Sequence, residues 1–454
     1  MTTGLIISIV LIIFTAILLL KKYHPHAVLL LCGLLMLMIS MFLHNPLPKL
    51  SSETGLKGFD LFKFITESFE ETNAGVGLMI MAIGGFVDYI DKIGASDTLV
   101  RVSMKPLSIF KNKPYIAASL VIPIGQLLFL AIPSAAGLAL LLMASLYPIL
   151  INLGVSKLTA VSVITATTAF GIGPASAITV SAAHISQVDI VYFFVNHQIE
   201  LMILLTLTLM ISYYFVNQFY DKKEKIETSQ QVEKEKKVQA PLIYAIIPIF
   251  PIFLLILFSD LLNLFPFKVS LDTTTAMFIS LFVAVIFELI RLRDFRKVLD
   301  SLKIFWNGMG NIFKSVVTLI IAADIFAKGL ISLGFIDGLL DISQSVGLGA
   351  VGISIVMTLI IFFASMLMGS GNASFFAFGP LVPKIAKKLG VETTSMIIPM
   401  QFSASMGRTV SPVAGVIIAV AEIAQVSTLQ IVKRNLIPLI TALIVMLCFH
   451  FIFN

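Results

Sequence analysis

Apolar runs of about 17 to 25 residues recur along this chain, and this is the length that crosses a lipid bilayer as a helix. The first two runs are Gly4 to Leu20 and Ala27 to Leu43. Hydrophobic residues make up 58% of the chain and charged residues only 12%, which is more apolar surface than a soluble domain can bury. The sequence therefore predicts an all-α polytopic membrane protein.

Several of these runs are interrupted by residues that favour turns. The interrupted runs are about 115–152, broken at Pro133 to Gly137; about 158–185, broken at Gly171 to Pro174; about 350–388, broken at Gly369 to Ser374; and about 394–421, broken at Gly407 to Pro412. Irregular backbone at membrane depth persists only where it is buried in protein or lines a cavity. We interpret the first and third runs as re-entrant helical hairpins, and the second and fourth as broken transmembrane helices.

The second half of the chain repeats the first. Leu153-Gly154-Val155 matches Leu389-Gly390-Val391 at an offset of 236 residues (389 − 153), and Gly173-Pro174 matches Ser411-Pro412 at 238 (411 − 173). Lysines and arginines cluster in short loops, and this positive-inside bias places the two copies in opposite orientations. Inverted repeats that carry broken helices are typical of secondary transporters.

The repeat divides the chain into five expected regions. These are 1–74, N-terminal spans and an interfacial segment; 75–218, the first inverted repeat; 219–240, a charged cytoplasmic linker; 241–315, connecting spans with a basic loop; and 316–454, the second inverted repeat.

Arg408 stands alone in an apolar stretch, since the nearest charges in sequence are Glu392 and Glu422. A charge at bilayer depth costs at least roughly 2.5 to 3.5 kcal/mol, so such a residue usually has a function. A guanidinium beside a broken helix favours an anionic ligand, because it can hold a carboxylate with two hydrogen bonds. The alternative is a structural ion pair inside the helix bundle.

The tips and breaks supply the other candidate residues, because half-helix N-termini and small polar side chains suit an anion. The expected substrate-binding residues are Ser134, Ala136, Gly137, Ser176, Ser370, Gly371, Asn372, Ala373, Arg408, Thr409 and Ser411. Gly173, Pro174 and Pro412 are the expected helix breaks, whose freed carbonyls could coordinate a cation. The alternatives are close helix packing for the small residues and simple kinks for the prolines.

Two further charges in the apolar runs admit two interpretations. Asp324 and Lys328 lie four residues apart on one helix face, where they can neutralise each other. Lys328 also matches Asp88 at an offset of 240 (328 − 88), so the other arrangement is a pair between the repeats.

At the second tip and the second break the chain resembles the bacterial anaerobic C4-dicarboxylate carriers of the DcuC family. The residues that carry the resemblance are Gly369 to Ala373, Gly407 to Val416 and Val432 to Arg434, and the similarity covers essentially the whole chain. It implies a multi-pass protein of the bacterial inner membrane that carries succinate, fumarate or malate, mainly by succinate efflux or exchange. It also implies a scaffold with an elevator-like transport domain, and a homodimer.

One departure from the family pattern concerns the first break. Where the family is expected to carry Ser-Gly-Asp after the proline, this chain has Ser176-Ala177-Ile178. The missing acidic residue leaves the substrate and the coupling ion open.

The sequence thus predicts a secondary carrier of C4-dicarboxylates with protons or sodium as candidate coupling ions and no cofactor. Its partners would be the dicarboxylate and the lipid bilayer, not nucleic acid. The alternatives are a carrier of another small organic anion, such as a monocarboxylate or an aminoacyl compound, an anion channel, or an intramembrane enzyme. The chain has no G-x-x-x-x-G-K-[ST] loop for ATP and no zinc-like Cys/His spacing, so we expect neither an enzyme nor a metal site.

Overall fold

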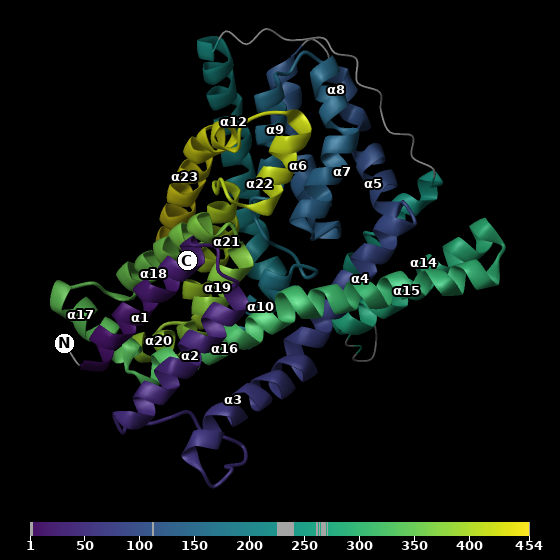
Figure 1. The fold of residues 1–454 in the computed structure, drawn as a ribbon. Helices are drawn as coiled ribbons and strands as arrows, with labels where there is room; N and C mark the ends of the chain where they lie inside the picture. Colours follow the sequence, from purple (N-terminus) through teal and green to yellow (C-terminus); the bar gives the residue numbers. More distant parts are fainter. Residues whose placement is uncertain are drawn as a thin grey trace.

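The computed structural model describes residues 3–110, 113–224, 240–259 and 271–453, together with residues 262, 264 and 269. Every regular element in these ranges is a helix, and no strand occurs within them (Figure 1). The prediction of an all-α protein is therefore confirmed.

Eight helical units in the described part of the chain are long and apolar enough to cross a membrane. They are α2 (Pro25–Phe42), Lys57–Lys92, α6 (Pro114–Ala131), Ile190–Lys223, α14 (Thr273–Leu292), Phe295–Ser332, α18 (Ala350–Met368) and α23 (Thr428–Phe453). The chain is a multi-pass membrane protein, as its composition predicts.

The other helices are mostly shorter and include both halves of the two broken runs and the second half of each hairpin run; α11 and α12 together form the Ile190–Lys223 unit named above. They are α1 (Thr3–Leu20), α5 (Ala95–Met104), α7 (Ala135–Ser145), α8 (Tyr147–Asn152), α9 (Lys157–Ala166), α10 (Ala177–Ile185), α11 (Ile190–Phe193), α12 (Ile199–Glu224), α13 (Phe250–Leu257), α17 (Phe335–Val346), α19 (Gly371–Phe378), α20 (Val382–Leu389), α21 (Thr393–Thr409) and α22 (Gly415–Ala424). In Figure 1, α5 to α9 gather at one end of the molecule with α12, α22 and α23 beside them.

Two long bent units cross in the middle of the molecule (Figure 1). The first joins α3 (Lys57–Thr72) to α4 (Leu78–Lys92), and the second joins α15 (Phe295–Ile312) to α16 (Thr318–Ser332), each through a π-helical turn. The backbones come close because Gly85 has no side chain. A Cβ atom at Gly85 would lie 2.7 Å from the carbonyl oxygen of Phe305.

The segment before α4 differs from the sequence expectation. The sequence suggested an interfacial piece followed by a span that starts near Gly75, but α3 and α4 form one helical unit with a kink at Gly75. The unit is continuous because α3 packs on α16, where the Ser68 hydroxyl donates to Asp324 at 2.6 Å. An isolated amphipathic pattern does not reveal such a tertiary contact.

Two expected loops are also shorter than the sequence suggested. The basic stretch after α14 becomes helix α15 almost at once, because the Asp294 carboxylate caps it by accepting from the Lys297 amide at 3.1 Å. The linker expected at 219–240 begins later, since α12 extends to Glu224. Residues 225–239 of that linker lie outside the described residues.

The crossing of α4 and α15 yields a testable prediction. Gly85→Ala places a methyl group against the Phe305 carbonyl, so it should lower the unfolding free energy by about 1 to 3 kcal/mol through overpacking. The matched control is Gly310→Ala on α15, where nothing lies within 4 Å of an added Cβ. Thermal melting of the two variants in detergent should differ. Equal melting temperatures would show that the crossing is not closely packed.

Candidate functional site

The two helix breaks are irregular segments whose backbone groups are bound by buried amide side chains. The first break separates α9 from α10, and the second separates α21 from α22. The Gly173 amide donates to Gln198 Oε1 at 3.0 Å, and Asn435 Nδ2 donates to the Thr409 carbonyl at 3.0 Å. Both amide side chains are fully buried. Irregular backbone therefore has internal partners at both breaks, as it must at membrane depth.

The same two amides also connect the halves of the chain. Gln198 Nε2 donates to Gln401 Oε1 on α21 at 2.9 Å, and Asn435 Nδ2 donates to Thr165 Oγ1 on α9 at 3.0 Å. Gln198 thus joins the first break to α21, the helix before the second break. Asn435 joins the second break to α9, the helix before the first break.

The two tips begin new helices with a serine cap. The Gly137 amide donates to Ser134 Oγ at 3.1 Å at the start of α7, and the Ala373 amide donates to Ser370 Oγ at 3.2 Å at the start of α19. A capping hydroxyl satisfies one of the unpaired amides of the first turn. The tips have the same local chemistry in both halves.

A cavity of about 250 Å³ lies where the first tip, the first break, α4 and α21 meet. Its polar lining consists of Asp88, Ser134, Ser176, Asn372, Ser405 and Arg408. Its apolar and small lining residues are Ile80, Ile83, Gly84, Val87, Phe129, Pro133, Ala135, Gly171, Ala175, Ala177, Ile178, Ile312 and Val316. The cavity therefore combines a cation, hydroxyls and an amide inside an otherwise apolar enclosure.

Arg408 is the cation of this cavity. It stands at the end of α21 and donates one hydrogen bond to the Thr168 carbonyl in the first break. Among the described residues it forms no ion pair with any carboxylate, so the structural ion pair considered from the sequence is not formed there. A guanidinium has five N–H donors, and its planar geometry matches a carboxylate. The arrangement can hold an anion.

The structure brings four of the sequence-predicted residues to this cavity: Ser134, Ser176, Asn372 and Arg408. They come from the first tip, the end of the first break, the second tip and the second broken helix. Residues almost 300 positions apart (408 − 134 = 274) therefore meet at one site, and the tips and breaks are what the sequence pointed to.

The other predicted substrate residues lie outside the lining: Ala136, Gly137, Ser370, Gly371, Ala373, Thr409 and Ser411. Thr409 Oγ1 donates to the Ser405 carbonyl at 2.9 Å, and Ser411 Oγ accepts from the Val413 amide at 3.3 Å. A Cβ at Gly371 would lie 2.7 Å from the Ala404 carbonyl, so its small size serves helix packing. Ala373 lines a separate apolar pocket between α1, α2, α16 and α18. The expected breaks Gly173, Pro174 and Pro412 lie between helices and outside the cavity lining.

Sequence reasoning missed two polar residues of the cavity, Asp88 and Ser405. A signal for Ser405 existed, because Gln401, Ser405 and Arg408 recur at helical spacing along one side of α21. Asp88 was considered only as a partner of Lys328, and that pair is not formed in the described structure.

Lys328 is neutralised on its own helix, as the first of the two interpretations held. Its ammonium group lies 2.7 Å from Asp324 Oδ2 and 2.9 Å from Ser68 Oγ.

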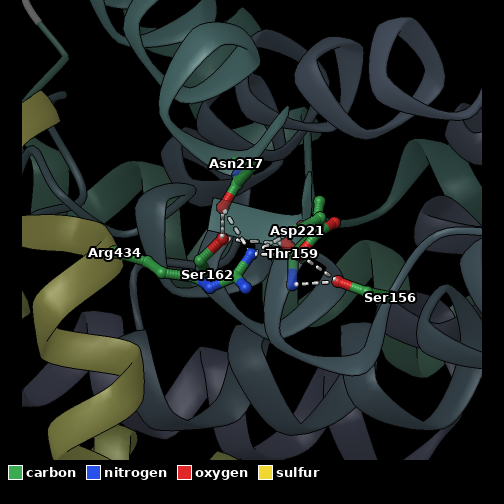
Figure 2. Close-up of polar contacts among 6 residues, drawn as sticks. All are labelled: Ser156, Thr159, Ser162, Asn217, Asp221 and Arg434. Carbon is green, nitrogen blue, oxygen red and sulfur yellow. Dashed lines mark hydrogen bonds and ion pairs between the residues drawn. The ribbon is translucent and has the colours of Figure 1, made fainter. Parts of the chain in front are cut away.

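A second arginine shows what a structural guanidinium looks like in this fold (Figure 2). Arg434 is 1% exposed and lies 2.6 Å from Asp221 Oδ1. Ser156 and Thr159 of the α9 start donate to the same carboxylate at 2.9 and 2.7 Å. Asn217 Oδ1 completes the cluster, 3.4 Å from the guanidinium. The network joins α9, α12 and α23.

This network corrects two sequence interpretations. The charge pattern favours short loops for lysines and arginines such as Arg434, and the sequence predicts a charged linker that includes Asp221, but both residues are buried inside helices. Their pairing could not be read from positions 213 residues apart.

Removing one partner of this pair should destabilise the protein. Arg434→Gln leaves Asp221 buried without its counter-charge, which should cost about 3 to 5 kcal/mol. The double variant Asp221→Asn/Arg434→Gln should recover part of that loss, because neither charge is then unpaired.

Thermal melting measures both effects, with Lys303→Gln as the control, since Lys303 forms an exposed pair. A single variant that melts like the control would contradict a structural role for the pair.

The sequence is similar to those of known proteins. The profile of the C4-dicarboxylate anaerobic carrier family (DcuC) matches residues 3–453. The anaerobic C4-dicarboxylate transporter DcuC of Escherichia coli K12 is 33% identical over 444 residues, covering 98% of this chain and 95% of the relative. A probable DcuC transporter of Vibrio cholerae is 34% identical over 426 residues, covering 93% and 92%.

Two solved structures share the fold at 14% sequence identity. One is MtrF of Neisseria gonorrhoeae, described with a class of antimetabolite efflux pumps, with a TM-score of 0.66 over 95% of this chain and 96% of that chain. The other is the YdaH transporter of Alcanivorax borkumensis, with a TM-score of 0.63 over 94% and 98%. At this identity the likeness concerns the fold alone.

Proposed function

This chain belongs to the C4-dicarboxylate anaerobic carrier family, and on that premise we propose that it is a secondary transporter of C4-dicarboxylates such as succinate, fumarate and malate. The family is one of carriers, so the chain is not an enzyme. The observation that carries the proposal is Arg408, which lines the cavity and forms no ion pair with a carboxylate among the described residues. In this proposal Arg408 binds one substrate carboxylate.

The rest of the cavity supports a small, doubly charged ligand. Its volume of about 250 Å³ lies below the roughly 300 to 1,000 Å³ of pockets for drug-sized molecules. Ser134, Ser176 and Asn372 can donate hydrogen bonds to a second carboxylate at some distance from Arg408. Apolar side chains such as Phe129 and Ile178 suit the short hydrocarbon segment between the carboxylates.

We propose further that the chain consists of two inverted repeats. The helices from α3 to α10 recur in the same order from α15 to α22, and the unit Ile190–Lys223 corresponds to α23. The π-helical turns at Asn73–Gly77 and Phe313–Val317 are 240 residues apart (313 − 73), and Gly94 and Gly334, both at φ +80°, have the same offset. The reciprocal amide bonds across the two breaks fit the same relation.

In this proposal the helix pairs α6–α7 and α18–α19 are re-entrant hairpins, and they move with the broken helices against a scaffold built around α4 and α16. Such an elevator-like motion would expose the site to each side of the bacterial inner membrane in turn. The protein would act as a homodimer, exporting succinate or exchanging it for another dicarboxylate, with protons or sodium as the coupling ion. No cofactor is required.

Removing the charge of Arg408 should weaken succinate binding. Arg408→Gln removes one side of a buried charged pair with the substrate, which should cost about 2 to 5 kcal/mol of binding, or roughly 30-fold or more in Kd. Arg408→Lys should restore little, because a point charge lacks the two-donor fork. The measurement is the rise in melting temperature caused by succinate, together with transport of labelled succinate by proteoliposomes.

Arg434→Gln is the matched control for this experiment. It should lower the melting temperature with or without succinate, yet keep the succinate-induced rise, because Arg434 lies in the buried network and not in the cavity. A stable Arg408→Gln protein that binds succinate as tightly as the parent chain would remove Arg408 from the site.

Competition with succinate transport by a panel of monocarboxylates and aminoacyl compounds shows whether the substrate is one of these anions instead of a C4-dicarboxylate.

The proposed movement of the hairpins against the scaffold can be tested by crosslinking. Val87 on α4 and Phe129 on α6 both line the cavity, one from the expected scaffold and one from the expected hairpin. Cysteines at these positions, in a chain with Cys32→Ser and Cys448→Ser, should crosslink at a rate that changes when succinate is added. A crosslinking rate that never responds to substrate would contradict a relative movement of the two parts.

A further inference from the structure

Asp88 and Arg408 are the ionisable residues among the described side chains that line the cavity. Asp88 reaches the cavity from α4, which carries none of the candidate residues at the tips and breaks. The first break contributes no acidic side chain, and Ile178 occupies the cavity wall directly after it. The carboxylate of the cavity therefore comes from an element other than the tips and the breaks.

Asp88 forms no ion pair among the described residues, unlike its counterpart in the second half. Lys328, 240 positions later (328 − 88), is neutralised by Asp324 and Ser68. At the same offset of 240, Asp324 matches Gly84 on α4 (324 − 240), and Ser68 matches Gly308 on α15 (68 + 240). Neither glycine carries a side chain.

Gly308 also makes room for the carboxylate. A Cβ at this position would lie 2.8 Å from Asp88 Oδ2. The contact between α3 and α16 thus provides partners for Lys328, whereas the matching contact between α4 and α15 gives Asp88 no counter-charge among the described residues.

The charges of the cavity depend on what occupies it. In the empty cavity Asp88 and Arg408 sum to zero formal charge. A fully ionised dicarboxylate adds two negative charges. The occupied cavity then has a net charge of −2 unless it also binds a proton. Like charges in a shared site favour protonation of one carboxyl group. The carboxyl group that the protein can offer for this proton is Asp88.

We propose that Asp88 couples transport to protons, taking up one proton when a dicarboxylate enters the cavity and releasing it after the dicarboxylate leaves. The inference rests on the proposed function, since it assumes that the cavity binds a dicarboxylate. The proton comes from the aqueous phase on the side of entry, binds a carboxylate oxygen of Asp88, and returns to water on the side of exit. No other bond is made or broken.

Asp88 is the carboxyl group that lines the cavity itself. Asp91 is a second carboxyl group nearly one turn further along α4, and it lies outside the lining. From α15 the facing residues are Gly308 and Asn311, which carry no charge. Arg408 is the charged group that shares the cavity with it.

The test compares the parent chain with Asp88→Asn, Asp88→Glu and the control Asp300→Asn, which removes a 60% exposed carboxylate of α15. Succinate binding is measured by calorimetry in buffers of different ionisation enthalpy, at a pH where succinate is fully ionised, which gives the number of protons taken up. The parent chain, Asp88→Glu and Asp300→Asn should take up about one proton per succinate, and Asp88→Asn about none.

Transport by proteoliposomes supplies the second readout. A pH gradient should drive net succinate uptake by the parent chain and by Asp300→Asn, whereas any succinate flux that Asp88→Asn supports should not respond to the gradient. Asp88→Asn that takes up a proton or follows the gradient like the parent chain would overturn the inference. A parent chain that exchanges succinate but binds no proton would overturn it too, even if Asp88→Asn fails to fold. Absence of counterflow in the parent chain would instead contradict the proposed function.

Discussion

The structure depends on one constraint: charged side chains and backbone groups without helical hydrogen bonds must find partners inside an apolar environment. Neither can be left without partners in a membrane, because water is not available to hydrogen-bond them. The chain nevertheless breaks two helices at this depth and places Arg408 beside one of the breaks. The buried amides of Gln198 and Asn435 and the Thr168 carbonyl supply partners for these groups.

The two arginines show two solutions to that need. Arg434 is surrounded by Asp221, Thr159 and Asn217, so its charge and its donors are used within the protein. Among the described residues Arg408 donates to one backbone acceptor, the Thr168 carbonyl, and it lines a cavity. A buried pair with complete partners holds helices together, whereas a cation with spare donors has capacity for a ligand. The contrast is the main reason to assign the substrate to Arg408.

The fold was largely predictable because membrane helices can be recognised in a sequence by their length and apolar composition. The apolar runs predicted the spanning helices, and the glycine and proline interruptions predicted irregular segments after α9 and α21, although α9 ends at Ala166, five residues before Gly171 (171 − 166). What could not be predicted depends on contacts between distant segments. The continuity of α3 with α4 rests on the packing of Ser68 against Asp324. The burial of Arg434 rests on Asp221, far away in sequence.

The site was predictable in part for the same reason. Breaks and tips identify where a ligand can approach, and this reasoning found Ser134, Ser176, Asn372 and Arg408. It could not tell which neighbouring hydroxyls face inward, since the side chains of Thr409 and Ser411 bind local backbone instead. Asp88 lies in a helix without a break, so only the packing of α4 against the rest of the fold reveals it.

The most direct measurement is a structure of the protein with succinate bound, determined in a lipid nanodisc. The account predicts a ligand in the cavity with one carboxylate on the guanidinium of Arg408 and the other near Ser134, Ser176 or Asn372. Succinate bound elsewhere, with Arg408 turned to a protein carboxylate, would contradict it.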